Sequence, residues 1–141
     1  TQPPLPRDLV FKAVLSLLPP EVYDVIFSHG PAGEYTRHLR HEETSQAVQE
    51  LWLTGKIQAS QLAVFAYADQ GRGTLPQPDG NADIRKELQP KIWRTKYALI
   101  TETYGFSPQS WEARCTPSVE AFRLLPPGPA AARGIVEELS R

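Results

Sequence analysis

Fourteen prolines in a chain of 141 residues set the strongest limit on how this sequence can fold. Proline fixes its own φ angle, lacks an amide proton and keeps the preceding residue out of helical geometry. Most of the prolines lie between stretches whose apolar residues recur with helical spacing, a pattern typical of short helices joined by stiff connections. The sequence therefore predicts an all-α fold, a compact bundle of about six to eight short helices with Pro/Gly-rich connections.

Proline and glycine mark the ends of the first two expected helices. The first helix is expected to begin near Pro6 and to stop at the pair Pro19-Pro20. Pro20 then suits the first turn of a second helix, which Gly30 would end.

Residues 44–69 predict a helical hairpin. Gly55 is expected to end its first helix in the left-handed conformation, and Ile57 could fold back onto the last turn. Ser60 is expected to be the N-cap of the second helix of the hairpin.

The sequence predicts one helical domain over 1–141. The loop 70–80 is rich in glycine and proline and is the candidate break between subdomains. Residues 81–104 show the longest helical pattern, in which Pro90 either kinks the helix or starts a second one. A proline-rich break is followed by a final helix within 126–141.

Charge and cysteine content exclude several classes of protein. Fifteen basic and sixteen acidic residues give a net charge of −1, which excludes a broad polycationic nucleic-acid binder. A single cysteine, Cys115, excludes an intrachain disulfide framework and a cysteine-based zinc site, and favours a cytoplasmic location. The longest apolar run, Leu9–Leu18, is shorter than the roughly 20 residues of a membrane span, so no membrane association is expected. No cofactor is expected either.

The leading functional hypothesis is a non-catalytic interaction or assembly protein, an adaptor or scaffold that binds a protein partner or a second copy of the chain. The sequence carries more large apolar side chains than a bundle of short helices should bury. Exposed aromatic residues are typical of binding hot spots. The expected partner-binding residues are Trp52, Leu53, Tyr23 and Phe27.

A nucleic-acid-binding regulator is the second hypothesis. The segment 85–97 contains five basic residues and one glutamate, interleaved with aromatic side chains. On a single helix its cations would not align in one stripe, which favours a packed helix over a phosphate-tracking one. The expected contact residues are Arg85, Lys86, Lys91 and Arg94, and the 44–69 hairpin could serve instead as a helix-turn-helix.

A small metal-dependent hydrolase is the third hypothesis. On a helix His38 and His41 would face one way, with Glu42 beside them, and neutral imidazole is a common metal ligand. The helical zinc motif His-Glu-x-x-His is absent, and Arg37 and Arg40 would oppose a cation. A solvated polar face explains the same residues, so no metal ligand is assigned.

Four further features have plain structural explanations. The run Asp79–Asp83 resembles the start of a calcium loop but fits a helix cap better. Gly71–Gly73 lacks the residues of a phosphate-binding loop and is expected to be a connector. Lys96 is expected to extend its ammonium to water, and Cys115 to be an idle thiol.

Overall fold

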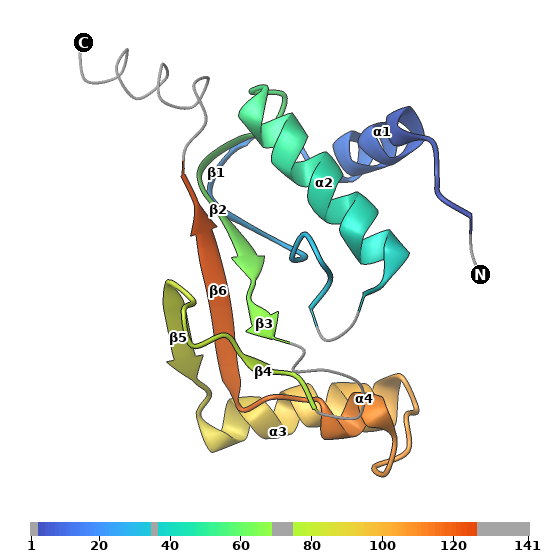
Figure 1. The fold of residues 1–141 in the computed structure, drawn as a ribbon, viewed down its shortest axis with the longest axis vertical. Helices are drawn as coiled ribbons and strands as arrows, with labels where there is room; N and C mark the ends of the chain where they lie inside the picture. Colours follow the sequence, from blue (N-terminus) through green and yellow to red (C-terminus); the bar gives the residue numbers. More distant parts are fainter. Residues whose placement is uncertain (1–2, 35–36, 69–74, 127–141) are drawn as a thin grey trace.

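The computed structural model describes residues 3–34, 37–68 and 75–126, which form an α/β fold (Figure 1). The helices are α1 (Arg7–Leu17), α2 (Leu39–Leu53), α3 (Pro90–Ala98), its π-helical extension η1 (Leu99–Thr103) and α4 (Trp111–Arg114). The strands are β1 (Val22–Ser28), β2 (Gln58–Phe65), β3 (Tyr67–Ala68), β4 (Gln77–Pro78), β5 (Ile84–Glu87) and β6 (Val119–Leu125).

A mixed four-stranded sheet with the order β1-β2-β6-β5 organises the fold, and β3 and β4 form a separate antiparallel pair. β1 and β2 are parallel, and α2 is the crossover that connects them. β6 pairs antiparallel with both β2 and β5. Helices α1 and α2 pack on one face of this sheet (Figure 1).

The all-α prediction is therefore wrong. Residues Val22–Ser28 form β1 where a helix was expected between Pro20 and Gly30. β-Branched and aromatic side chains crowd both sides of this segment, and such residues favour a pleated strand over a helix. The helical spacing of its apolar residues is a by-product of that crowding.

The first half of the predicted hairpin at 44–69 is correct, although α2 begins earlier, at Leu39. The helix ends as expected at Gly55, whose φ angle of 73° is left-handed. The backbone amide of Ile57 donates to the Leu51 carbonyl at 3.2 Å, so Ile57 folds back onto the last turn.

The second half of that hairpin is wrong, because Gln58–Phe65 form β2 and not a helix. Leu62, Ala63 and Val64 are buried in succession, so both faces of this strand are covered. A strand covered on both faces shows no alternation of polar and apolar residues, and periodicity cannot distinguish it from a buried helix.

The expected helix over 85–97 is also divided. Its first residues lie in β5, and α3 begins at Pro90. Pro90 therefore starts a helix, which is one of the two alternatives that the sequence predicted. The loop at 70–80 is partly ordered into β4, whose residue Gln77 pairs with Ala68. Residues 69–74 and the expected C-terminal helix lie outside the described residues.

Helix α1 begins and ends as the prolines predict. It starts directly after Pro6 and stops before Pro19, and Phe11 and Val14 pack against the core. Among the described residues, no helix combines the length and the apolar character needed to cross a bilayer.

Trp52 lies at the centre of the core between α2 and the sheet. Only 1% of its surface is exposed, and its indole N–H donates to the Ala59 carbonyl of β2 at 2.9 Å. Leu51 and Leu62 are fully buried beside it. Trp52 thus holds the crossover helix to the parallel strands and is not the exposed anchor expected from the sequence.

We predict that Trp52→Ala lowers the free energy of unfolding by about 3–5 kcal/mol, because it removes a buried ring and leaves a cavity. Urea denaturation followed by circular dichroism measures this change. The matched control is Leu53→Ala, whose side chain is exposed on the next position of α2 and should cost less than about 1 kcal/mol. Equal losses in the two variants would contradict the assignment.

Candidate metal centre

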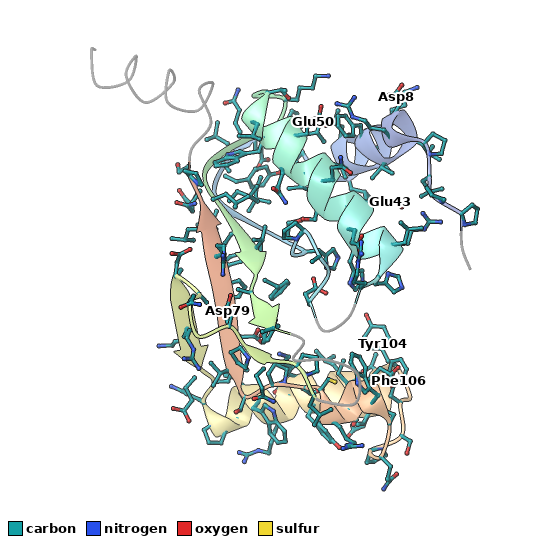
Figure 2. The ribbon with its side chains drawn as sticks, viewed as in Figure 1. Asp8, Glu43, Glu50, Asp79, Tyr104 and Phe106 are labelled. Atoms are coloured by element: carbon teal, nitrogen blue, oxygen red, sulfur yellow. The ribbon has the colours of Figure 1, made fainter. Side chains whose placement is uncertain are left out.

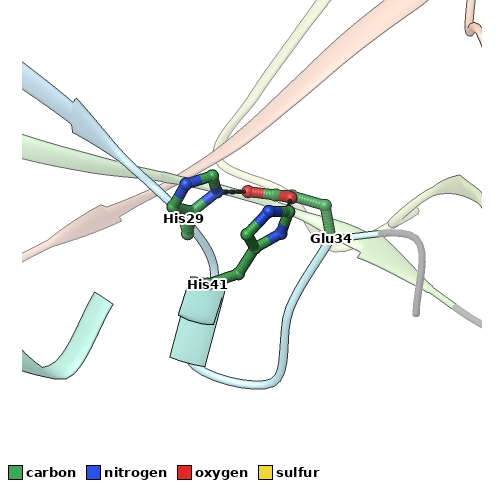
Figure 3. A group of neighbouring side chains, drawn as sticks. All are labelled: His29, Glu34 and His41. Carbon is green, nitrogen blue, oxygen red and sulfur yellow. Dashed lines mark hydrogen bonds and ion pairs between the residues drawn. The ribbon is translucent and has the colours of Figure 1, made fainter. Parts of the chain in front are cut away.

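A tight turn at the carboxyl end of β1 creates the candidate site. The Gly33 amide donates to the Gly30 carbonyl at 3.1 Å, and Gly33 has a left-handed φ angle of 83°. Pro31, the second residue of this turn, has the φ angle that such turns need. The turn reverses the chain, so His29 before it and Glu34 after it lie side by side (Figure 3).

The first turn of α2 supplies a third side chain. The Nδ1 atom of His41 lies 2.9 Å from one carboxylate oxygen of Glu34, and Nδ1 of His29 contacts the other. The two imidazole rings are stacked, with centroids 4.0 Å apart and 6° between their planes. One ligand atom from each of the three side chains lies within 4.8 Å of the other two. We refer to His29, Glu34 and His41 as the histidine centre.

Glu34 is the buried member of the centre. Its side chain is 8% exposed, and within the described part of the chain its ion-pair contacts are His29 and His41. A buried carboxylate needs hydrogen bonds or a cation to offset its lost hydration. Neither contact is a permanent cation, as a lysine or arginine would be.

Burial lowers the pKa of His41, the neighbouring His29 and His38 lower it further, and Glu34 acts in the opposite direction. An imidazole with a lowered pKa is neutral at pH 7, which is the form that binds metal ions. The centre therefore combines a negative carboxylate with a neutral nitrogen ligand.

The structure brings together two of the three predicted metal-site residues. The ring of His38 lies beside that of His41, with centroids 4.5 Å apart, although His38 is exposed and does not contact Glu34. Glu42 does not join them, because both of its oxygens accept hydrogen bonds from Arg37 at 2.9 Å. This pairing with Arg37 lowers the pKa of Glu42.

The arginines near the centre are neutralised, so they do not oppose a cation as expected from the sequence. Arg37 pairs with Glu42, and Arg40 pairs with Glu43. Glu43 also accepts the backbone amide of Leu5, the main cause of its lowered pKa.

Sequence reasoning missed His29 and Glu34. The signal that could have found them is the segment Gly30–Gly33, whose Gly-Pro-Ala-Gly order directly follows a run of β-branched and aromatic residues. If the apolar run is assigned as a strand and Gly30–Gly33 as a turn, then His29 and Glu34, which flank the turn, lie close together.

The four predicted partner-binding residues do not form one surface. Trp52 is buried, and Leu53 is exposed at the end of α2. Tyr23 is half-buried against the core, with its hydroxyl donating to the Pro19 carbonyl. Phe27 is exposed, and its ring contacts that of Phe122 on β6.

The four predicted nucleic-acid contacts are exposed, Arg85 and Lys86 in β5 and Lys91 and Arg94 in α3. Lys96, by contrast, pairs with Glu120, and does not simply extend to water as expected.

Asp79 caps no helix, so that expectation is wrong. It lies in the connection between β4 and β5, accepts the Asn81 amide and pairs with Arg123. Figure 2 shows its place beside the sheet. The glycines at 71 and 73 lie outside the described residues.

No family model matches this chain, and no curated protein or solved structure is significantly similar to it. Its function is therefore argued from the chemistry of the site itself.

We predict that Gly30→Ala perturbs the turn that positions the centre. An added Cβ would lie 2.8 Å from the carbonyl oxygens of both Gly33 and Phe65, and backbone atoms cannot move away as a flexible side chain would. The expected loss of unfolding free energy is about 1–3 kcal/mol. The control is Gly80→Ala, where an added Cβ meets nothing within 4 Å. A Gly30→Ala variant as stable as this control would contradict the close approach.

We predict that Cys115 resists alkylation in the folded protein. Burial, with a smaller contribution from Glu112, raises the pKa of its thiol to about 11. At about pH 8 the group is protonated and therefore a poor nucleophile. Mass spectrometry after iodoacetamide treatment measures the labelling, with urea-unfolded protein as the control. Equal labelling rates in folded and unfolded protein would contradict the prediction.

Proposed function

We propose that this protein is a metal-dependent hydrolase in which His29, Glu34 and His41 bind one divalent transition-metal ion. The observation that carries the proposal is the convergence of three ligand atoms within 4.8 Å around a buried carboxylate that has no lysine or arginine partner among the described residues. Ligands about 2.1 Å from a tetrahedral ion lie roughly 3.4 Å apart, so small rotations suffice to close the site. Two imidazoles and one carboxylate suit zinc and neighbouring ions.

The exposure of the two histidines supports a catalytic site over a structural one. Side-chain exposure is 34% for His29 and 37% for His41, so water reaches the centre. Structural zinc sites have four protein ligands, whereas catalytic sites have three and leave one position to water or substrate. A bound divalent ion would lower the pKa of that water to about 7 and so supply hydroxide at neutral pH.

The position of the centre in the fold agrees with this function. His29 follows the carboxyl end of β1, and the parallel strand β2 ends at the same edge of the sheet. In open α/β sheets, ligands bind beyond the carboxyl ends of the parallel strands. The side chains that would hold the ion thus come from a turn and a helix that the sheet supports.

We predict that the purified apoprotein binds Zn²⁺ with one site per chain in isothermal titration calorimetry. His29→Ala, His41→Ala and Glu34→Gln should each weaken binding at least about 100-fold, since each removes a ligand. The matched control is Glu42→Gln, which changes the carboxylate adjacent to His41 that pairs with Arg37 and should leave the affinity unchanged. Equal affinity in all four variants would contradict the metal centre.

Hydrolysis is tested separately, with bis(p-nitrophenyl) phosphate as the probe. We expect turnover that a chelator abolishes, that Zn²⁺ or Mn²⁺ restores and that His41→Ala lacks. Activity that survives complete metal removal would favour a metal-free mechanism, in which Glu34 orients a histidine as a general base.

Partner binding and a cytoplasmic location stay predictions from the sequence. The exposed residues Leu53 and Phe27 support partner binding, but their separation on two faces of the fold makes the histidine centre the stronger indication of function.

A further inference from the structure

The face of the sheet turned away from α1 and α2 carries a row of aromatic and apolar side chains. Strand pairing sets its membership, because directly paired residues share a face and alternate residues along a strand return to it. We refer to this surface as the open face. Its members include Val25, Phe27, Phe65, Phe122, Ile84 and Lys86.

Three phenylalanine rings form a continuous row across the open face. The ring of Phe122 lies 5.0 Å from that of Phe27, edge to face at 62°, and 5.2 Å from that of Phe65. Ala63, the β2 partner of Phe27, is almost completely buried in the sheet, and its small side chain leaves room for rings to meet above it. Phe27 remains 59% exposed, which is unusual for a ring in such a row.

Exposed cations lie at one end of this row. Lys86, Lys91 and Arg94, together the basic edge, form no ion pair with any described residue, and neither does Arg85, which lies on the opposite face of β5. In contrast, Arg7, Arg37, Arg40 and Arg123 each pair with a carboxylate.

The position of the basic edge follows from the order of elements. Lys86 shares the open face with Ile84, which is the direct partner of Phe122. Helix α3 begins three residues after β5, and Lys91 and Arg94 lie one turn apart on it. Lys86 therefore lies on the open face at its β5 edge, and Lys91 and Arg94 lie on the helix that follows this strand.

We propose that the open face and the basic edge bind single-stranded nucleic acid, and that this is the substrate of the histidine centre. Unpaired bases stack on exposed aromatic rings, and phosphates pair with lysine and arginine. Bases in a duplex are already stacked on one another, so exposed aromatic rings favour a single strand. A second copy of this chain would use the rings but would bring its own three unpaired cations and no counter-charge for them.

The same surface leads to the centre. Phe27 precedes His29 by two residues, which is about 7 Å along an extended chain. A base stacked on Phe27 thus places its own phosphate within reach of an ion held by His29. Hydrolysis adds one water across the phosphodiester: the water oxygen bonds to phosphorus, the bond from phosphorus to one sugar oxygen breaks, and that oxygen leaves with a proton as a hydroxyl group.

The binding part of this proposal does not need the metal, whereas the cleavage part rests on the proposed function. Binding is therefore measured by fluorescence anisotropy in the presence of a chelator, with a labelled single-stranded RNA of about 12 nucleotides, its DNA counterpart and a duplex. We expect the single strands to bind more tightly than the duplex and to lose affinity as salt increases.

Variants with matched controls locate the surface. Phe27→Ala should weaken binding about 5- to 100-fold through lost stacking. The double variant Lys91→Glu/Arg94→Glu should weaken it at least about 10-fold and reduce the salt dependence. The controls are Leu17→Ala and Lys56→Glu, an exposed apolar residue and an exposed cation outside the surface. Both should bind like the unchanged protein.

Several results would overturn the proposal. These are the absence of single-strand binding, equal losses in the control variants, stronger binding to anionic phospholipid vesicles than to RNA, and a dimer in light scattering that Phe27→Ala abolishes. Failure of Zn²⁺ to bind would remove cleavage and the proposed function but not strand binding. Cleavage of the bound RNA that requires Zn²⁺ and is lost in His41→Ala would support both.

Discussion

The parallel pairing of β1 with β2 is the constraint on which the rest of the structure depends. Parallel strands need a long crossover, and here α2 supplies it. Burial of Trp52 under that crossover fixes α2 against the sheet. Because the helix covers one face, its first turn meets the carboxyl end of β1 and brings His41 to His29, while the other face keeps its aromatic rings at the surface.

The sequence predicts the parts of this structure that local interactions decide. Prolines limit α1 correctly, and Gly55 ends α2 because only glycine adopts a left-handed φ angle at little cost. The strands could not be predicted in the same way. The apolar residues of Val22–Ser28 satisfy helical spacing as well as strand pairing, and the choice between them is made by β2, which lies more than thirty residues further along the chain.

The candidate site was likewise predictable only for those residues that are close together in the sequence. His38 and His41 are close in sequence and remain close in the structure. Glu42 is closer to His41 than Glu34 is along the chain, but the helix directs it to Arg37. His29 joins the site only through the reversal at Gly30–Gly33, and a helix over the same residues would have placed it elsewhere.

The N-terminal segment acts as a brace on the crossover helix. Its backbone at Pro3 and Leu5 is bonded to Arg40 and Glu43, and Arg7 pairs with Glu50, so the contacts extend along the side of α2 that Figure 2 shows facing α1. Arg40 is the immediate neighbour of His41. The orientation of His41, a candidate metal ligand, is thus mechanically tied to the N-terminal segment, and loosening this brace would disturb the histidine centre without touching a ligand.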